Sequence, residues 1–161
     1  MQSNEHILQL LSEIPDPEIP VISIVELGVI RKVQLNSDST EITITPTYSG
    51  CPAMKQMEDD IYKKLGEHNY PNIQIQTTYS PAWTTDWLTT ETKNKLRVYG
   101  IAPPEESTHD KSFLTGKPKT ITCPRCKSQQ THMISQFGST ACKALYKCDN
   151  CLEAFDYFKC I

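Results

Sequence analysis

The chain has 161 residues, a formal net charge of −3 and a hydrophobic content of 38%. This length suits one ordinary domain, or one domain with a small additional module. No apolar run approaches a membrane span, and the first eleven residues lack the basic start of a signal peptide. Seven cysteines in such a chain indicate a reducing, cytoplasmic location, with metal-binding or reactive thiols instead of disulfides.

The first segment predicts a helix that is followed by a stiff loop. Ser3 is a suitable N-cap, Pro15 is a suitable stop, and the apolar positions between them are Ile7, Leu10, Leu11 and Ile14. The loop 16–20 contains two prolines and presents the carboxylates of Asp16 and Glu18. These two carboxylates are either functional groups or ordinary residues that are simply solvated or cap a neighbouring turn.

The next segment predicts a hairpin, a tight turn and a helix. Residues 29–35 and 41–45 alternate with period two, as strands with one buried face do, and 36–40 is a hairpin loop. Gly50 marks a turn, and Pro52 is a favourable first residue for a helix whose apolar face is Met54, Met57, Ile61 and Leu65. Cys51 is then expected at the N-cap, where the helix dipole favours thiolate. The alternative is a buried thiol that packs as a small apolar side chain.

A third strand is expected at 73–79, and a last helix capped by Thr90 and running to Tyr99, with Leu96 and Tyr99 facing inward. Between them lie both tryptophans, either as the edge of a core or as an interface anchor. The predicted fold class is α+β, with a small mixed sheet covered by helices on one face and followed by a zinc-ribbon module. The predicted ranges are 1–102 for the first domain, 103–118 for a linker and 119–161 for the ribbon.

Two Cys-x-x-Cys pairs predict a metal site in the C-terminal module. They are Cys123 with Cys126 and Cys148 with Cys151, and residues 127–147 lie between them. Four thiolates in this pattern suit tetrahedral zinc, which would supply folding energy to a module with little core of its own. Cys142 is an alternative ligand. Otherwise Cys142 and Cys160 are structural thiols or a second, labile thiol site.

Several motifs resemble two related families. Asp16-Pro17-Glu18 and the segment Thr45-Pro-Thr-Tyr-Ser-Gly-Cys-Pro-Ala-Met54 resemble the SufT-like iron–sulfur assembly domain family. Four further motifs extend the likeness, and nearly the whole chain resembles the PaaD-like components of bacterial phenylacetyl-CoA ring-1,2-epoxidase systems. These motifs are Pro81-Ala-Trp-Thr-Thr-Asp-Trp87, Gly100-Ile-Ala-Pro-Pro104, Phe137-Gly-Ser-Thr-Ala-Cys-Lys-Ala-Leu-Tyr146 and Phe155-Asp-Tyr-Phe-Lys-Cys160.

The resemblance implies an accessory role in aerobic phenylacetate catabolism. The family's complex contains a di-iron oxygenase and a reductase with flavin and a [2Fe–2S] cluster, and one or both would be the partners of this chain. The PaaD-like component would assist assembly or insertion of the cluster and would not itself be catalytic. By resemblance, Asp16, Glu18 and Cys51 fall on signature positions for transient iron or cluster transfer, and the four ribbon cysteines on a structural zinc site.

Three other functions remain open on the sequence alone: a scaffolding subunit of the oxygenase complex, a thiol-dependent enzyme and a nucleic-acid-binding ribbon. The enzyme is disfavoured because no Cys-x-x-Cys stands at Cys51 and the histidines, at 6, 68, 109 and 132, are scattered. Residues 1–116 carry 9 basic and 16 acidic side chains (−7), and residues 117–161 carry 7 and 3 (+4). Zinc with four thiolates lowers this +4 to about +2, which disfavours nucleic acid. The sequence leaves the oligomeric state open.

Overall fold

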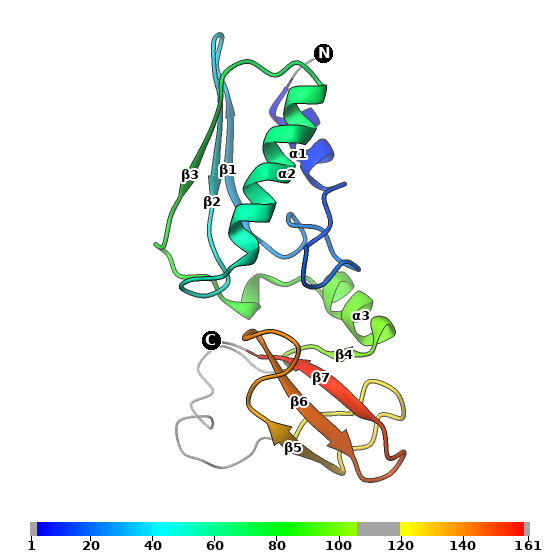
Figure 1. Ribbon diagram of the computed structural model, residues 1–161. Coiled ribbons are helices and arrows are strands. Elements are labelled where there is room, and N and C mark those ends of the chain that lie inside the picture. The colour runs from blue at the N-terminus through cyan, green and yellow to red at the C-terminus, as the bar shows by residue number, and fades with distance from the viewer. Residues whose placement is uncertain (1–2, 106–119, 160–161) are drawn as a thin grey trace. The chain divides into compact units, whose positions relative to one another are not determined.

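The computed structural model describes residues 3–105 and 120–159 and contains two compact units, Met1–Trp83 and Thr84–Ile161 (Figure 1). Each unit has its own β-sheet. Among its described residues the first unit contains two helices and three strands, in the order α1 (Asn4–Leu11), β1 (Ile30–Leu35), β2 (Thr40–Ile44), α2 (Ala53–Glu67) and β3 (Ile73–Thr77).

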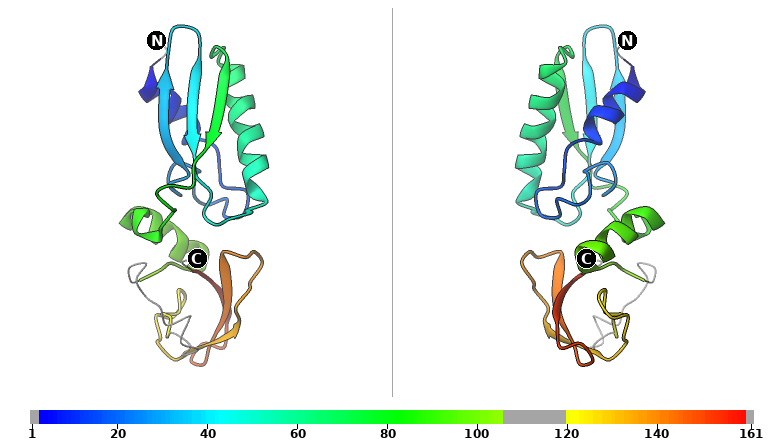
Figure 2. Two further views of the ribbon diagram at one scale, coloured as in Figure 1. Left: turned by 90° about the vertical axis from the view of Figure 1, so that its left-hand side faces the viewer. Right: turned by 90° about the vertical axis from the view of Figure 1, so that its right-hand side faces the viewer.

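The sheet of the first unit is mixed. Its order is β1-β2-β3, with β2 antiparallel to β1 and parallel to β3. Both helices lie on the same face of this sheet, as the two side views show (Figure 2). Thr40, Ile42 and Ile44 of β2 are buried, while Glu41 and Thr43 between them are half-buried, which is the alternation expected of a sheet covered on one face. The predicted α+β class with helices on one face is confirmed.

The helices of the first unit form in the predicted segments with two shifts: α1 ends at Leu11 and does not reach Ile14, and α2 begins after Pro52. Ser3 caps α1 by accepting the N–H of His6, and Ile7, Leu10 and Leu11 are buried. In α2 the buried face is Ala53, Met57, Ile61 and Leu65. Pro52 is the N-cap of α2, however, so Cys51 lies one residue before the cap and not at it.

The second unit contains a short 3-10 helix, one α-helix and four strands among its described residues. Its sheet has the order β4-β7-β6-β5, in which β4 is parallel to β7 and the other pairs are antiparallel. The elements are η1 (Thr85–Trp87), α3 (Thr90–Tyr99), β4 (Ile101–Ala102), β5 (Thr131–Ser135), β6 (Lys143–Cys148) and β7 (Ala154–Phe158).

The second unit includes residues that the sequence assigns to the first domain. Ile101 and Ala102 pair with Asp156 and Tyr157 of β7, so the chain enters the ribbon's sheet just before the predicted linker. Most of that linker, together with Cys160, lies outside the described residues. The domain boundaries drawn from the sequence therefore stay a prediction.

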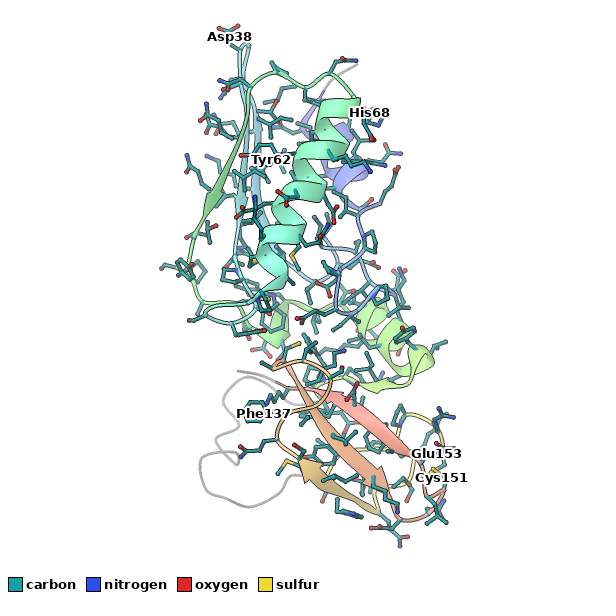
Figure 3. All side chains as sticks on the ribbon, in the orientation of Figure 1. Asp38, Tyr62, His68, Phe137, Cys151 and Glu153 are labelled. Atoms are coloured by element: carbon teal, nitrogen blue, oxygen red, sulfur yellow. The ribbon has the colours of Figure 1, made fainter. Side chains whose placement is uncertain are left out.

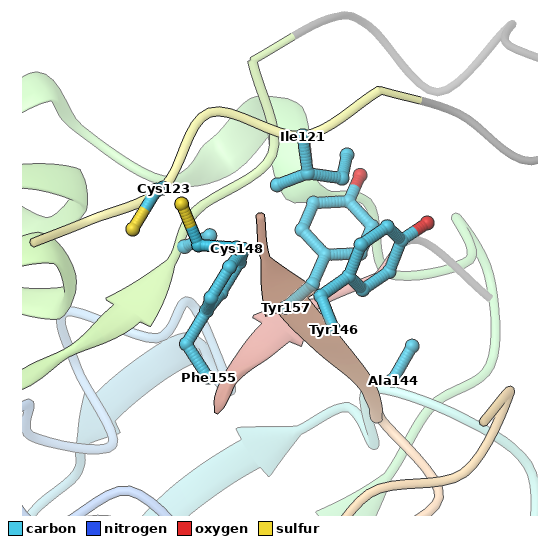
Figure 4. Close-up of a cluster of buried hydrophobic side chains, with 8 residues drawn as sticks. Ile121, Cys123, Ala144, Tyr146, Cys148, Phe155 and Tyr157 are labelled. Carbon is cyan, nitrogen blue, oxygen red and sulfur yellow. The ribbon is translucent and has the colours of Figure 1, made fainter. Parts of the chain in front are cut away.

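A compact aromatic core holds the second unit together (Figure 4). The ring of Tyr146 stacks on Phe155 with centroids 6.0 Å apart and meets Tyr157 edge-on at 5.7 Å. Cys123 and Cys148 are buried in the same cluster, which also contains Ala102, Ile121 and Ala144. We call each Cys-x-x-Cys pair with its turn a knuckle. One cysteine of each knuckle is thus held in place by the same packing that stabilises the sheet.

Helix α3 ends as predicted but presents a different face. Gly100 closes it in the left-handed conformation, with φ of +98°, which glycine adopts without steric cost. Leu96 is buried as expected, whereas Tyr99 is 55% exposed, so the inward position predicted for Tyr99 is wrong. Thr89, not Thr90, is the N-cap.

Candidate metal and thiol sites

The four ribbon cysteines lie together in the second unit. Their sulfur atoms are all within 4.8 Å of one another. The Sγ atoms of Cys123 and Cys151 are 3.8 Å apart, and those of Cys126 and Cys148 are 3.5 Å apart. A tetrahedral ion with metal–sulfur bonds of about 2.3 Å places its ligands about 3.8 Å from one another. The cluster therefore has the dimensions and the donor set of a zinc-type site.

Each knuckle is closed by backbone hydrogen bonds around its cysteines. The N–H of Lys127 donates to the carbonyl of Cys123, and the N–H of Cys148 donates to the carbonyl of Glu153. The residue after the second cysteine of each pair has a positive φ: +62° at Lys127 and +65° at Leu152. This left-handed residue turns the chain sharply, so that two sulfurs three residues apart point at one place.

The four thiols do not ionise independently. The backbone N–H of Ser128, followed by the Asn150 side chain, lowers the pKa of Cys126 to about 6. At Cys151 the N–H of Glu153 lowers the pKa, but desolvation and the three neighbouring thiols outweigh it and raise the pKa to about 12. Four thiolates at this spacing repel one another, so full ionisation requires a cation between them.

Cys142 lies outside this cluster. Its Sγ is 3.0 Å from the hydroxyl of Thr140, and the side chain is buried. The alternative in which Cys142 replaces a ligand of the second knuckle has no support in this arrangement, because Cys148 and Cys151 are both in place. The other predicted member of a second thiol site, Cys160, lies outside the described residues.

Cys51 is a buried thiol in the first unit, with 9% of its surface exposed. Burial raises its pKa, the N–H of Ala53 and the hydroxyl of Tyr48 lower it, and the carboxylates of Glu18 and Asp16 raise it further. The net direction is upward. The expectation of an accessible thiolate stabilised by the start of α2 is therefore wrong, because desolvation and two carboxylates outweigh the helix terminus.

The loop 16–20 lies close enough to Cys51 for its two carboxylates to act electrostatically on the thiol. Asp16 is 3% exposed, and its Oδ1 accepts the N–H groups of Glu18 at 2.9 Å and Ile19 at 2.7 Å. Asp16 therefore caps a turn, which is one form of the plainer interpretation of this loop, but it is buried and not solvated. Both Asp16 and Glu18 act electrostatically on Cys51, so the structure also brings together the three residues that the functional interpretation requires.

Tyr48 is a contact of Cys51 that the sequence patterns do not predict. Its hydroxyl hydrogen-bonds the Cys51 thiol, and the N–H of Cys51 donates to the carbonyl of Tyr48 at 3.3 Å. The signal that could have found it is the spacing, because a tyrosine three residues before a turn cysteine can fold back onto it.

Two of the histidines lie close together in the fold although they are far apart in the sequence. None of the described histidines is among the groups that shift the pKa of Cys51. His6 and His68 have ring centroids 5.9 Å apart in the first unit. His132 pairs with Asp149 at 2.9 Å in the second unit. His109 lies outside the described residues. These contacts give no support to a Cys51–His nucleophile.

Both ends of the chain match known protein families. A family model described as "Iron-sulfur cluster assembly protein" matches residues 4–70, and one described as "PaaD zinc beta ribbon domain" matches residues 107–159. An Escherichia coli (strain K12) protein, named as the D component of 1,2-phenylacetyl-CoA epoxidase, is 49% identical over 152 residues, which cover 94% of this chain and 90% of that protein. The chain belongs to the PaaD family.

Relatives of the first unit alone are also known. A "Fe-S protein maturation auxiliary factor" from Porphyromonas gingivalis is 31% identical to this PaaD-family chain over 98 residues, covering 60% of the chain and 92% of that protein. The crystal structure of a domain of unknown function (DUF59) from Bacillus anthracis matches with a TM-score of 0.54 and 26% identity, covering 58% of the chain and 90% of that structure. The first unit therefore has the fold of a protein class that also occurs without the ribbon.

Among residues 3–105 and 120–159, no helix has both the length and the apolar character that a bilayer crossing requires.

Proposed function

We propose that this PaaD-family chain is an accessory factor that assists iron–sulfur cluster assembly or insertion in the reductase of a phenylacetyl-CoA epoxidase. The observation that carries the proposal is the electrostatic interaction of the Cys51 thiol with Asp16 and Glu18, which come from a separate segment of the chain. The matching family descriptions and the names of the relatives support the cluster-assembly part. The name of the Escherichia coli relative supports the epoxidase part.

The residues around Cys51 suit a cargo that is held briefly. Thiolate is the usual ligand of iron in clusters, and carboxylates are hard ligands that accept ionic iron. One thiolate gives a weak site from which iron or a cluster can pass to a partner with more cysteines. Tyr48 and the N–H of Ala53 can hydrogen-bond the sulfur when no cargo is present. The chain would thus deliver cargo without catalysing the ring chemistry.

Zinc is the metal we propose for the four-cysteine cluster, with a structural role. The family description names a zinc ribbon, and the sulfur separations of 3.5 and 3.8 Å fit a tetrahedral ion. When bound, zinc would neutralise the thiolates and fix the two knuckles. Cys123 and Cys148 are already buried in the aromatic core, so the metal and the core would stabilise each other.

The deciding experiment measures cluster content in the client. The reductase is produced together with wild-type chain, with Cys51→Ser or with Cys142→Ser, and its [2Fe–2S] content is measured by visible absorption and by iron and sulfide analysis. We expect a lower content only with Cys51→Ser. Equal content in all three would exclude a transfer role for Cys51. The Cys51→Ser chain must also match the wild-type chain in its circular dichroism spectrum and its zinc content. A folding defect in this variant would instead indicate that Cys51 is a core thiol.

A scaffolding role is the second candidate, because Cys51 is buried and its pKa is raised. This alternative predicts that the Cys51→Ser chain still restores epoxidase assembly, measured by co-purification of the reductase and the oxygenase. Complexes that form normally and contain a fully loaded reductase would favour the scaffold. Complexes that form normally but contain an unloaded reductase would favour the maturation factor.

A further inference from the structure

His6 and His68, far apart in the sequence, lie next to each other at the end of α2 that is opposite Cys51. Their ring centroids are 5.9 Å apart and the ring planes are nearly perpendicular, at 82°. His6 belongs to α1, and His68 is the C-cap of α2. Figure 3 shows His68 at this end of the helix, at the surface. Two imidazoles from two helices therefore meet within the first unit.

A buried tyrosine holds one of the two rings. The hydroxyl of Tyr70 is 2.7 Å from Nδ1 of His6, and Tyr70 is only 5% exposed. The backbone of Ser3 also hydrogen-bonds this phenol, which fixes it from a second direction. Histidines that bind metals commonly donate the N–H of one ring nitrogen to a fixed acceptor, while the other nitrogen faces the ion. The phenol oxygen of Tyr70 can accept from Nδ1 in this way. For His6 that other nitrogen is Nε2.

The separation of the rings suits one shared ion. Metal–nitrogen bonds of about 2.0–2.1 Å put an ion about 3.2 Å from the centroid of each imidazole. Two rings on a tetrahedral ion then have centroids about 5.2 Å apart, and two rings trans to each other on an octahedral ion about 6.4 Å. The observed 5.9 Å lies between these values. Reaching either value requires the exposed His68 side chain to move from its observed position.

We propose that His6 and His68 form a two-imidazole site for a borderline divalent transition-metal cation, with Tyr70 as the positioning residue. Imidazole nitrogens suit Ni²⁺ and Zn²⁺, and the site contains no thiolate among the described residues, which separates it chemically from the ribbon cysteines. Glu13 acts electrostatically with both histidines, but its carboxylate is held by Lys64 at 2.5 Å. Water would fill the remaining coordination positions.

An ion at this site would join α1 to α2. It requires both histidines in their folded positions, so it binds the folded first unit more tightly than the unfolded chain. Binding of this kind raises the melting temperature as the free ion concentration increases. A generic surface histidine would give no such stabilisation of this unit.

The experiment uses full-length protein with its ribbon loaded with zinc, titrated with NiCl₂ in a calorimeter. We expect one Ni²⁺ to bind per first unit and to raise the melting temperature. His6→Gln and His68→Gln should each weaken binding by about tenfold or more, and Tyr70→Phe by about tenfold, because outer partners of a ligand contribute on this scale. His132→Gln is the matched control, since His132 lies in the other unit beside Asp149.

Unchanged Ni²⁺ affinity in His68→Gln would overturn the proposal, and so would the absence of saturable binding in wild type. His68 is exposed, so its replacement tests the site without disturbing the core. If the weaker-binding variant were His132→Gln, the ion would belong to the second unit and the proposal would also fail. Retained affinity in Tyr70→Phe would overturn the positioning role of Tyr70.

Discussion

The indole N–H of Trp83 donates a 2.9 Å hydrogen bond to the carbonyl oxygen of Leu27. Both residues are buried, and Gly28, the next residue, turns the chain with φ of +80°. The bond joins the segment after β3 to the turn before β1. It also decides between the two interpretations of Trp83, because a side chain used in this way belongs to the core edge and not to an exposed interface.

We expect Trp83→Phe to lower the free energy of unfolding by about 1–3 kcal/mol, because it leaves the buried Leu27 carbonyl without this donor and removes ring volume. Urea unfolding followed by circular dichroism would measure the change. Tyr79→Phe is the control, since Tyr79 is 66% exposed and should change stability by less than about 0.5 kcal/mol. Equal effects of both substitutions would contradict a specific role for the bond.

Thr40→Val should stabilise the first unit by about 1 kcal/mol. The Oγ1 of Thr40 is fully buried and has no hydrogen-bond partner among the described residues. Valine keeps the branched shape that suits β2, and the backbone bond from Thr40 N–H to the Asn72 carbonyl stays. Thr43→Val, at a half-buried position of β2, should have little effect. A loss of stability in Thr40→Val would mean that the hydroxyl has a partner, such as a buried water.

Cys148→Ser should release the ribbon metal and loosen the second unit, while Cys142→Ser should retain the metal. Only the first of these residues belongs to the four-sulfur cluster. Zinc per chain, measured by mass spectrometry of the metal, and amide hydrogen exchange over β5 and β6 would report both effects. The assignment of ligands fails if Cys142→Ser loses zinc and Cys148→Ser does not.

Alkylation of Cys51 should be slow near neutral pH and should increase above the usual thiol pKa. Its pKa is raised, so the neutral thiol persists to higher pH than in an unfolded chain, and thiolate is the species that reacts. Glu18→Gln removes a negative charge that raises this pKa, so it should shift the pH profile of alkylation downward. Iodoacetamide labelling with peptide mass spectrometry would measure the rate at each pH.

Asp38→Asn is the control for this charge effect. Asp38 is exposed in the hairpin loop between β1 and β2, and it is not among the groups that shift the pKa of Cys51. Its substitution should leave the alkylation profile unchanged. An upward shift in Glu18→Gln would contradict the sign of the interaction and the placement of the loop 16–20.

Local sequence patterns are sufficient to predict the main elements of the first unit and the cluster of four cysteines. Period-two alternation identifies β1, β2 and β3, and the apolar spacing of Met57, Ile61 and Leu65 identifies the buried face of α2, because both periods follow from backbone geometry alone. The two Cys-x-x-Cys pairs predict the sulfur cluster, since each pair can wrap around one ion whatever the rest of the fold does.

The ionisation of Cys51 and the neighbour of His6 depend instead on tertiary packing. The sequence places Cys51 near a helix terminus, but the thiol responds more strongly to desolvation and to two carboxylates that a separate loop brings to it. His6 and His68 meet because α1 and α2 pack on the same face of the sheet. Burial and through-space charge depend on which segments meet, and a pattern along one chain does not contain that information.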